Sequence, residues 1–105
     1  MAEFRVEKSS GYTVMSNHHL FDSGISLKAK GLLSIMLSMP DGWDYTLAGL
    51  AENNRDGIEA IRAAFNELVN AGYLVRQQVK REDGKFTGNK YIIQEKPMFG
   101  EGDVL

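Results

Sequence analysis

The apolar positions of residues 56–74 repeat with the period of an α-helix. Steps of three and four residues place them on one face: Ile58, Ile61, Phe65, Leu68 and Val69. Asp56 followed by Glu59 resembles a capping box, and Gly72 suits the left-handed conformation that ends many helices. The pattern predicts a helix over about residues 56–71. Its opposite face is polar and carries Glu59, Arg62, Asn66 and Asn70.

Two helices are expected before it. Ser26 and Pro40 delimit the first, Leu27–Met39. Its apolar positions exceed what one packing face needs, so we expect it to be central to the domain or partly covered by another chain. Gly31 lowers its helix propensity by about 1 kcal/mol relative to alanine, which suggests close approach of another element.

Thr46 can cap a second, short helix over residues 47–54. The polar turn Asn53-Asn54-Arg55 then leads into the long helix. A short and a long helix joined by a short polar turn are typical of a helix-turn-helix.

Alternation replaces the helical period after Gly72. Tyr73–Arg81 reads as a strand, with Tyr73, Val75 and Val79 on one face and Arg76, Gln78 and Lys80 on the other. Asp83-Gly84 and Gly88-Asn89 are turn signals, and Lys90–Gln94 is the return strand, after a loop that carries Lys85 and Phe86. An isolated hairpin is marginal in water, so it must pack on the helices or gain a third strand from Trp43–Tyr45. The predicted fold is mainly α with a β-hairpin wing (α+β), a winged helix-turn-helix.

The N-terminal region is expected to hold an extended arm at residues 1–11, ordered by the core or by a partner. The domain then runs over residues 12–96, and 97–105 are a C-terminal tail or the start of a linker. A short helical turn should bury Leu20 and Phe21, and Asp22-Ser23-Gly24 is a turn. His18 and His19 are adjacent and cannot easily chelate one ion, so we interpret both as surface histidines.

Composition excludes several functional classes. The 105 residues suit one domain, and the absence of cysteine excludes disulfides and thiolate metal sites. No apolar run approaches the roughly 20 residues that span a bilayer, and no signal peptide begins the chain, so we expect a cytoplasmic protein without membrane contact. No phosphate-binding loop, zinc-ligand spacing or catalytic triad occurs. We therefore expect neither an enzyme nor a cofactor or metal.

Charge is distributed unevenly along the chain. The formal net charge is −2, yet residues 73–96 hold six basic residues against three acidic ones, a local charge of +3 that leaves −5 elsewhere. A local basic patch can bind phosphate although the whole molecule is acidic.

The order of these segments resembles a known family. The phrases SLKAKGLLSIMLSMPDGWDYT and NELVNAGYLVR carry the resemblance, which extends over about residues 12–95. It is to the winged-helix N-terminal domains of bacterial and phage replisome organisers and replication initiators of low-GC Gram-positive bacteria, including the DnaD-like group. The resemblance implies DNA binding or primosome assembly, often with self-association. Longer members have a further C-terminal domain that is missing here, so a small stand-alone DNA-binding protein is expected.

The leading hypothesis is binding of double-stranded DNA. Arg62 and Asn66, at i and i+4, would read the major groove, where arginine suits guanine and asparagine suits adenine. The wing would contact phosphates, which sets register without reading sequence. The candidate residues are Asn54, Arg55, Arg62, Asn66, Lys80, Arg81, Lys85 and Lys90. Alternatively, Arg62 only pairs with Glu59 or Asn66 on a solvated helix face.

Two expectations concern protein partners. We expect a homodimer, formed through Leu27–Met39 and the arm, which would present two recognition helices. The rival hypothesis is a winged helix that binds a replication or transcription partner protein without direct DNA contact. The negative net charge of the chain and the carboxylates of Asp56 and Glu59 favour that rival hypothesis, and the basic wing disfavours it.

Overall fold

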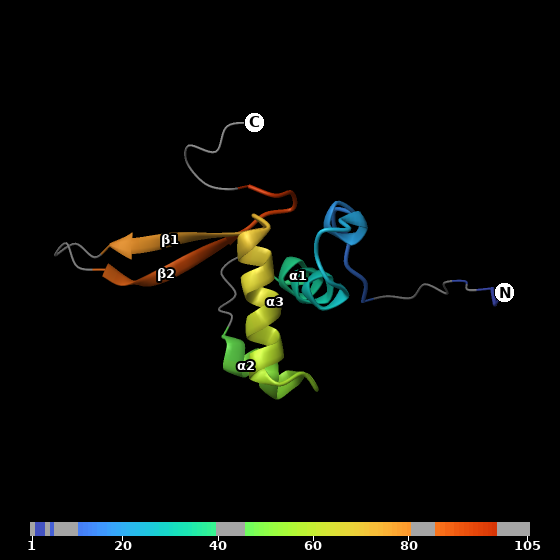
Figure 1. Ribbon diagram of the computed structural model, residues 1–105, viewed down its shortest axis with the longest axis horizontal. Helices are drawn as coiled ribbons and strands as arrows, with labels where there is room; N and C mark the ends of the chain where they lie inside the picture. Colours follow the sequence, from blue (N-terminus) through green and yellow to red (C-terminus); the bar gives the residue numbers. More distant parts are fainter. Residues whose placement is uncertain (1, 4, 6–10, 40–45, 81–85, 99–105) are drawn as a thin grey trace.

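The computed structural model describes residues 2–3, 5, 11–39, 46–80 and 86–98 of the chain. These residues form three α-helices and a two-stranded antiparallel sheet, which confirms the mixed α+β class (Figure 1). The elements are η1 (His19–Phe21, a 3-10 helix), α1 (Leu27–Ser38), α2 (Leu47–Asn53), α3 (Ile58–Asn70), β1 (Leu74–Lys80) and β2 (Phe86–Ile93). The strand proposed at residues 43–45 lies outside the described residues.

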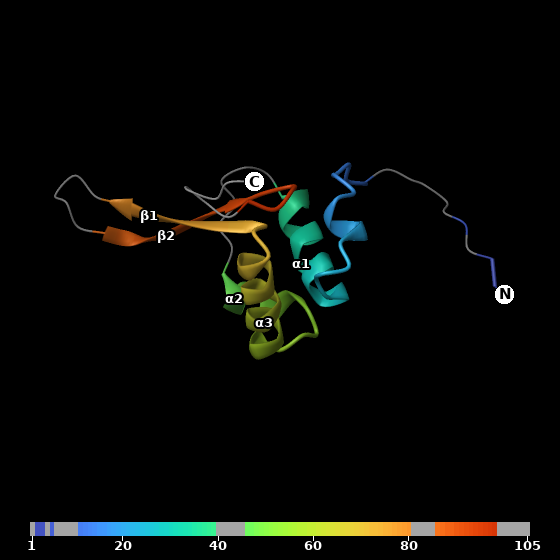
Figure 2. The ribbon, with the colours of Figure 1, turned by 45° about the horizontal axis from the view of Figure 1, so that its top comes forward.

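Helix α3 lies at the centre of the helices, and the hairpin leaves from its C-terminal end. Helices α1 and α2 both contact α3, whereas η1 lies against α1. Strands β1 and β2 project away from the helices in both views (Figures 1 and 2). In the described part of the chain, no helix is both long enough and apolar enough to cross a membrane.

Side-chain caps begin α1 and α2 as the sequence predicts. The Ser26 hydroxyl accepts a 3.1 Å hydrogen bond from the Ala29 backbone N–H, and the Thr46 hydroxyl accepts one of 2.9 Å from Gly49. Each bond satisfies one of the free N–H groups of a first helical turn. The predicted starts of both helices are therefore confirmed.

The capping box predicted for α3 is wrong. The N-cap is Gly57, which has no side chain to offer, so Asp56 lies one position too early. Its carboxylate instead lies 3.7 Å from the Lys28 ammonium at the start of α1. The Glu59 carboxylate binds Arg62 rather than the N-cap backbone.

The end of α3 is a Schellman motif centred on Gly72. The backbone N–H of Tyr73 donates to Leu68 O at 3.0 Å, and that of Gly72 donates to Val69 O at 3.2 Å. Gly72 has φ of +88°, which only glycine adopts at low cost. Both Leu68 and Tyr73 are fully buried, and they supply the apolar contact that accompanies this motif. The predicted role of Gly72 is confirmed.

The face of the hairpin that packs on α3 begins with Leu74. Leu74 pairs with Ile93 and Arg76 with Tyr91, so these four residues share one face. Leu74 is buried in the core, and the Tyr91 ring meets the Phe65 ring of α3 edge to face at 4.9 Å. The predicted alternation of Val75 and Val79 against Arg76, Gln78 and Lys80 agrees with this strand. Tyr73 was wrongly placed in the strand, because it belongs to the motif that ends α3.

The return strand begins earlier than predicted. Phe86 and the Gly88-Asn89 pair lie within β2, so they form neither a loop nor a turn. The ladder shifts register between Val79 and Lys80, where Val79 pairs with Gly88 and Lys80 with Phe86. One extra residue on β2 is therefore accommodated as a bulge, which locally increases strand twist.

The core lies between α1, α3 and the first residue of β1. Its buried members are Ile25, Ala29, Leu32, Leu33, Met36, Ala64, Leu68, Tyr73 and Leu74. Leu27, counted in the apolar stripe of the first helix, is 86% exposed. Gly31 is also exposed, and a Cβ built there would meet none of the described residues within 4 Å. The predicted close approach of another element at Gly31 is therefore wrong for the described part of the chain.

The segment before α1 buries a different residue from those predicted. His19 is fully buried, whereas Phe21 is 81% exposed and Leu20 is 41% exposed. The interpretation of His19 as a surface residue and the predicted burial of Leu20 and Phe21 are both wrong. The turn at residues 22–24 is confirmed, because Asp22 Oδ1 accepts a 2.8 Å bond from the Gly24 N–H.

Candidate nucleic-acid interface

The polar face of α3 is exposed. Arg62 and Asn66 lie on it together with Glu59 and Asn70, while Ile61, Ala64 and Leu68 on the opposite face are buried. Arg62 Nη1 donates to Glu59 Oε1 at 2.5 Å, so the guanidinium is held by the preceding turn of the same helix. This pairing is the alternative that the sequence left open for Arg62. Such an exposed pair contributes little to stability, about 0–1 kcal/mol.

The turn before α3 holds two of the candidate residues, Asn54 and Arg55, in different settings. Asn54 is the C-cap of α2, and its side-chain amide donates to Leu50 O at 2.9 Å. That bond satisfies a carbonyl at the end of the helix, which gives Asn54 a structural role. Arg55 follows it on the exposed turn that leads into α3.

The two strands of the hairpin contain basic residues and no acidic ones. Their charged residues are Arg76, Lys80 and Lys90. Arg76 pairs with Tyr91, Lys90 with Gln77, and Lys80 stands beside the bulge. The candidates Arg81 and Lys85 lie outside the described residues. The packing of Tyr91 on Phe65 fixes the base of this basic hairpin to α3.

Acidic side chains accompany the basic ones near the start of α3. Glu52, Asp56 and Glu59 are all exposed there. Asp56 faces Lys28 at 3.7 Å and Glu59 binds Arg62, so both carboxylates have cationic partners. The helix start is thus close to neutral, whereas the hairpin strands are positive.

A polar pair that sequence reasoning missed, the buried Tyr73 and the half-buried Asp22, lies at the other end of α3. The Tyr73 hydroxyl donates a 2.7 Å hydrogen bond to Asp22 Oδ2. This bond and that from the Gly24 N–H hold the pKa of Asp22 below its ordinary value. Burial, and then the bond to Asp22, raise the pKa of Tyr73 far above its ordinary value. The turn signal at residues 22–24 locates Asp22, but nothing local to it indicates a partner 51 residues away.

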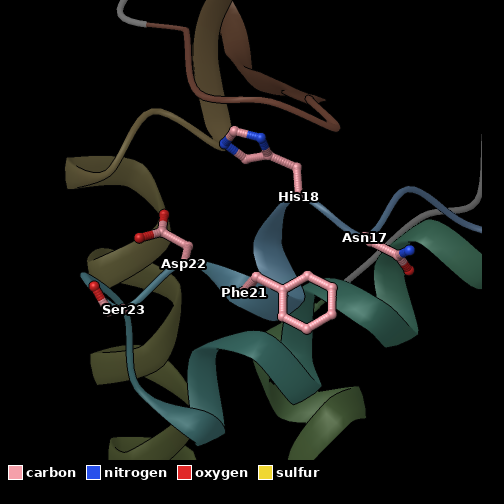
Figure 3. Close-up of a pocket in the computed structure, with 5 residues that line it drawn as sticks. All are labelled: Asn17, His18, Phe21, Asp22 and Ser23. Atoms are coloured by element: carbon pink, nitrogen blue, oxygen red, sulfur yellow. The ribbon is translucent and has the colours of Figure 1, made fainter.

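An open surface hollow lies beside this pair and is lined by Asn17, His18, Phe21, Asp22 and Ser23 (Figure 3). The side chains of Asn17 and Asp22 lie on opposite sides of it, and the His18 ring points toward the join between α3 and β1. The His18 and Tyr73 ring centroids are 6.2 Å apart. The polar groups that line the hollow therefore do not converge on one point. In the described segments, no group of three or more acidic or histidine side chains is placed to hold a metal ion.

The comparisons with known proteins add no family to this picture. A scan against protein-family models, a search of curated proteins and a search of solved structures each returned no match.

Proposed function

We propose that this protein binds double-stranded DNA as a winged helix, with α3 in the major groove and the β1–β2 hairpin against the phosphate backbone. The observation that carries the proposal is the charge of the hairpin. All charged residues of its two strands are basic, and it projects from the C-terminal end of a helix whose polar face is exposed (Figure 1). Contacts from basic residues to phosphates supply much of the affinity of DNA-binding proteins.

Base reading is assigned to Arg62 and Asn66. Both are exposed and one turn apart on α3. Arg62 would exchange its bond to Glu59 for a guanine edge, and Asn66 would bind adenine. Because the exposed Arg62–Glu59 pair is weak, its loss costs at most about 1 kcal/mol, less than the 1–3 kcal/mol that a bidentate base contact gives.

Two further parts of the proposal rest on the family resemblance. The biological role would be replication initiation, primosome assembly or transcription regulation. The active species would be a homodimer, which presents two hairpins to one duplex. Leu32, Leu33 and Met36 of α1 are buried within the chain itself, so the dimer interface cannot be the whole apolar stripe of that helix. Light scattering at high protein concentration should give a dimer mass, and a monomer mass would refute this part.

Fluorescence anisotropy with a random-sequence duplex tests DNA binding. Lys80→Gln/Lys90→Gln removes two charges from the hairpin, and Arg5→Gln/Lys8→Gln removes two from the N-terminal arm. Wild type should bind more weakly as salt rises, because binding releases counterions. The hairpin variant should bind more weakly than wild type. The slope of its log affinity against log salt concentration should fall by about 1 for each phosphate that it no longer neutralises. The control variant should keep the affinity and the slope of wild type. Absence of binding by wild type at low salt would refute the proposal.

The second candidate is a protein-interaction module, and the pairing of Arg62 with Glu59 favours it. A guanidinium already satisfied by a neighbouring carboxylate leaves α3 with a nearly neutral polar face, together with exposed Glu52. Salt separates the two functions. Phosphate binding weakens steeply with salt, whereas docking through neutral and apolar contacts does not.

A further inference from the structure

His19 fastens the short helix η1 to α1 through a single hydrogen-bonded chain. Its Nε2 lies 2.8 Å from the Ser34 hydroxyl, which itself donates to Lys30 O at 2.8 Å. A hydroxyl has one proton, and here the Lys30 carbonyl takes it. Ser34 must therefore accept from His19, so Nε2 of the imidazole carries a proton.

The other ring nitrogen of His19 is buried and has no partner. Nδ1 is shielded from solvent and makes no hydrogen bond to the described residues. A neutral imidazole tolerates this, since the atom is only an unused acceptor. Protonation would turn it into a buried N–H donor with no acceptor and add a charge to a fully buried ring. Either change is costly in a protein interior.

The groups around His19 oppose a positive charge. On α1, the Lys30 ammonium donates to Leu20 O at 3.1 Å, and Ser34 is neutral. On its own segment, His18 is adjacent, and the Asp22 carboxylate is already bound by Gly24 and by Tyr73 from the α3–β1 join. Burial, then His18, then Lys30 lower the pKa of His19 below its ordinary value of 6.5.

We propose that His19 is an acid-sensitive latch, whose protonation releases residues 17–21 from α1 while α1, α3 and the hairpin stay folded. Helix η1 buries little else, because Leu20 and Phe21 are both exposed. A second hydrogen bond to α1, from the Lys30 ammonium to Leu20 O, lies on the surface. Segments with few buried contacts open well below the free energy of global unfolding.

The direction of the pH dependence follows from the two states of the ring. In the open state the pKa of His19 is near 6.5, and in the closed state it is lower. The latch is therefore closed above pH 6.5 and loses stability as pH falls below it. Its opening constant should rise about tenfold per pH unit until pH reaches the lowered pKa of the closed state. The Asp22–Tyr73 bond persists through this window, because the pKa of Asp22 lies below 3.8.

Amide hydrogen exchange by NMR tests the latch. The N–H groups of Leu20, Phe21 and Asp22 bond within the segment, to Asn17 O or His19 O, and they report its opening. Their protection factors should fall about tenfold per pH unit below pH 6.5 and stay well below those of α3, because local opening costs less free energy than global unfolding. His19→Gln keeps a donor at the Nε2 position and cannot titrate, so its segment should show no such fall. The exposed neighbour gives the control, His18→Gln, which keeps His19 and should therefore still show the fall below pH 6.5.

Three results would overturn the latch. One is a wild-type His19 titration with its midpoint at or above pH 6.5. Another is an unchanged pH dependence in His19→Gln. The third is equal protection of the segment and of α3 at every pH, which would mean that the segment opens only by global unfolding. If circular dichroism shows that His19→Gln does not fold, the proposal is tested by the two wild-type measurements. These are the titration midpoint of His19 and the comparison of the segment's protection with that of α3. None of these readouts depends on DNA binding.

Discussion

The Tyr73 hydroxyl and the Asp22 carboxylate join the two ends of the domain core by a 2.7 Å hydrogen bond. Asp22 lies in the turn before α1, and Tyr73 in the turn that leads from α3 to β1. The other oxygen of the same carboxylate accepts from the Gly24 N–H. One side chain thus closes a local turn and fixes it to the start of the hairpin.

Tyr73→Phe should lower the free energy of unfolding by about 1–2 kcal/mol. The phenyl ring keeps the buried packing, while the charge-assisted hydrogen bond to Asp22 is removed. The cost stays moderate because Asp22 is half-buried and water can replace the hydroxyl. Urea denaturation measures the change. Tyr12→Phe, at a tyrosine that is 76% exposed, is the control and should change stability by less than about 0.5 kcal/mol.

The same carboxylate should make the fold sensitive to acid. The folded-state pKa of Asp22 lies below its ordinary value of 3.8, chiefly because Tyr73 donates to it. Its contribution is therefore complete above pH 3.8 and is lost as pH falls through the lower, folded-state pKa. Asp22→Asn should be less stable than wild type at about pH 6, and the gap should narrow at lower pH. A gap that stays constant with pH in urea titrations would contradict this assignment.

Ser26 and Glu67 should be energetically coupled. Ser26 caps α1, and both its backbone N–H and its hydroxyl donate to the Glu67 carboxylate of α3, the hydroxyl at 2.9 Å. Ser26→Ala should cost about 1–2 kcal/mol, because it removes both the cap and the hydroxyl's bond to Glu67. A double-mutant cycle with Glu67→Gln should give a coupling above about 0.5 kcal/mol. Thr46→Ala, which removes the cap of α2, should add to Glu67→Gln without coupling.

Replacement by alanine should have opposite effects on stability at Gly31 and at Gly72. Gly31→Ala should stabilise the protein by about 0.5–1 kcal/mol, because the site is exposed, helical and open around the new Cβ. Gly72→Ala should destabilise it by more than about 1 kcal/mol, because φ there is +88°. Thermal unfolding of both variants compares them directly. Destabilisation by Gly31→Ala would indicate a contact at that face outside the described residues.

Local signals in the sequence predict the helices well, and tertiary packing explains the misses. Ser26, Thr46 and Gly72 set helix ends through bonds to backbone within a few residues, so their positions suffice. His19 is buried because Ser34, 15 residues later, accepts from it, and an adjacent pair of histidines carries no sign of that. Tyr73 is expected in the strand from the sequence pattern, but it belongs to the turn that ends α3, and β1 begins with the buried Leu74.

The candidate interface could be predicted only as a set of exposed residues. Helical periodicity identifies the exposed face of α3 with Arg62 and Asn66. It does not decide whether Arg62 pairs with Glu59 three residues before or with Asn66 four residues after, because helical neighbours at both spacings can meet. Nor does it show that Asn54 serves the end of α2.

Glu59 should act as a restraint on DNA binding through Arg62. Glu59→Gln removes the partner that holds the guanidinium and a negative charge from the helix face, so duplex affinity should rise several-fold. Arg62→Gln should lower it by about 5- to 100-fold if Arg62 reads a base. Glu3→Gln removes one exposed carboxylate from the N-terminal arm and serves as the charge control. Both variants at α3 should fold normally, since the pair is exposed. If Glu59→Gln matches Glu3→Gln and Arg62→Gln binds like wild type, the face of α3 does not touch DNA, and the protein-interaction module becomes the better account of the same exposed surface.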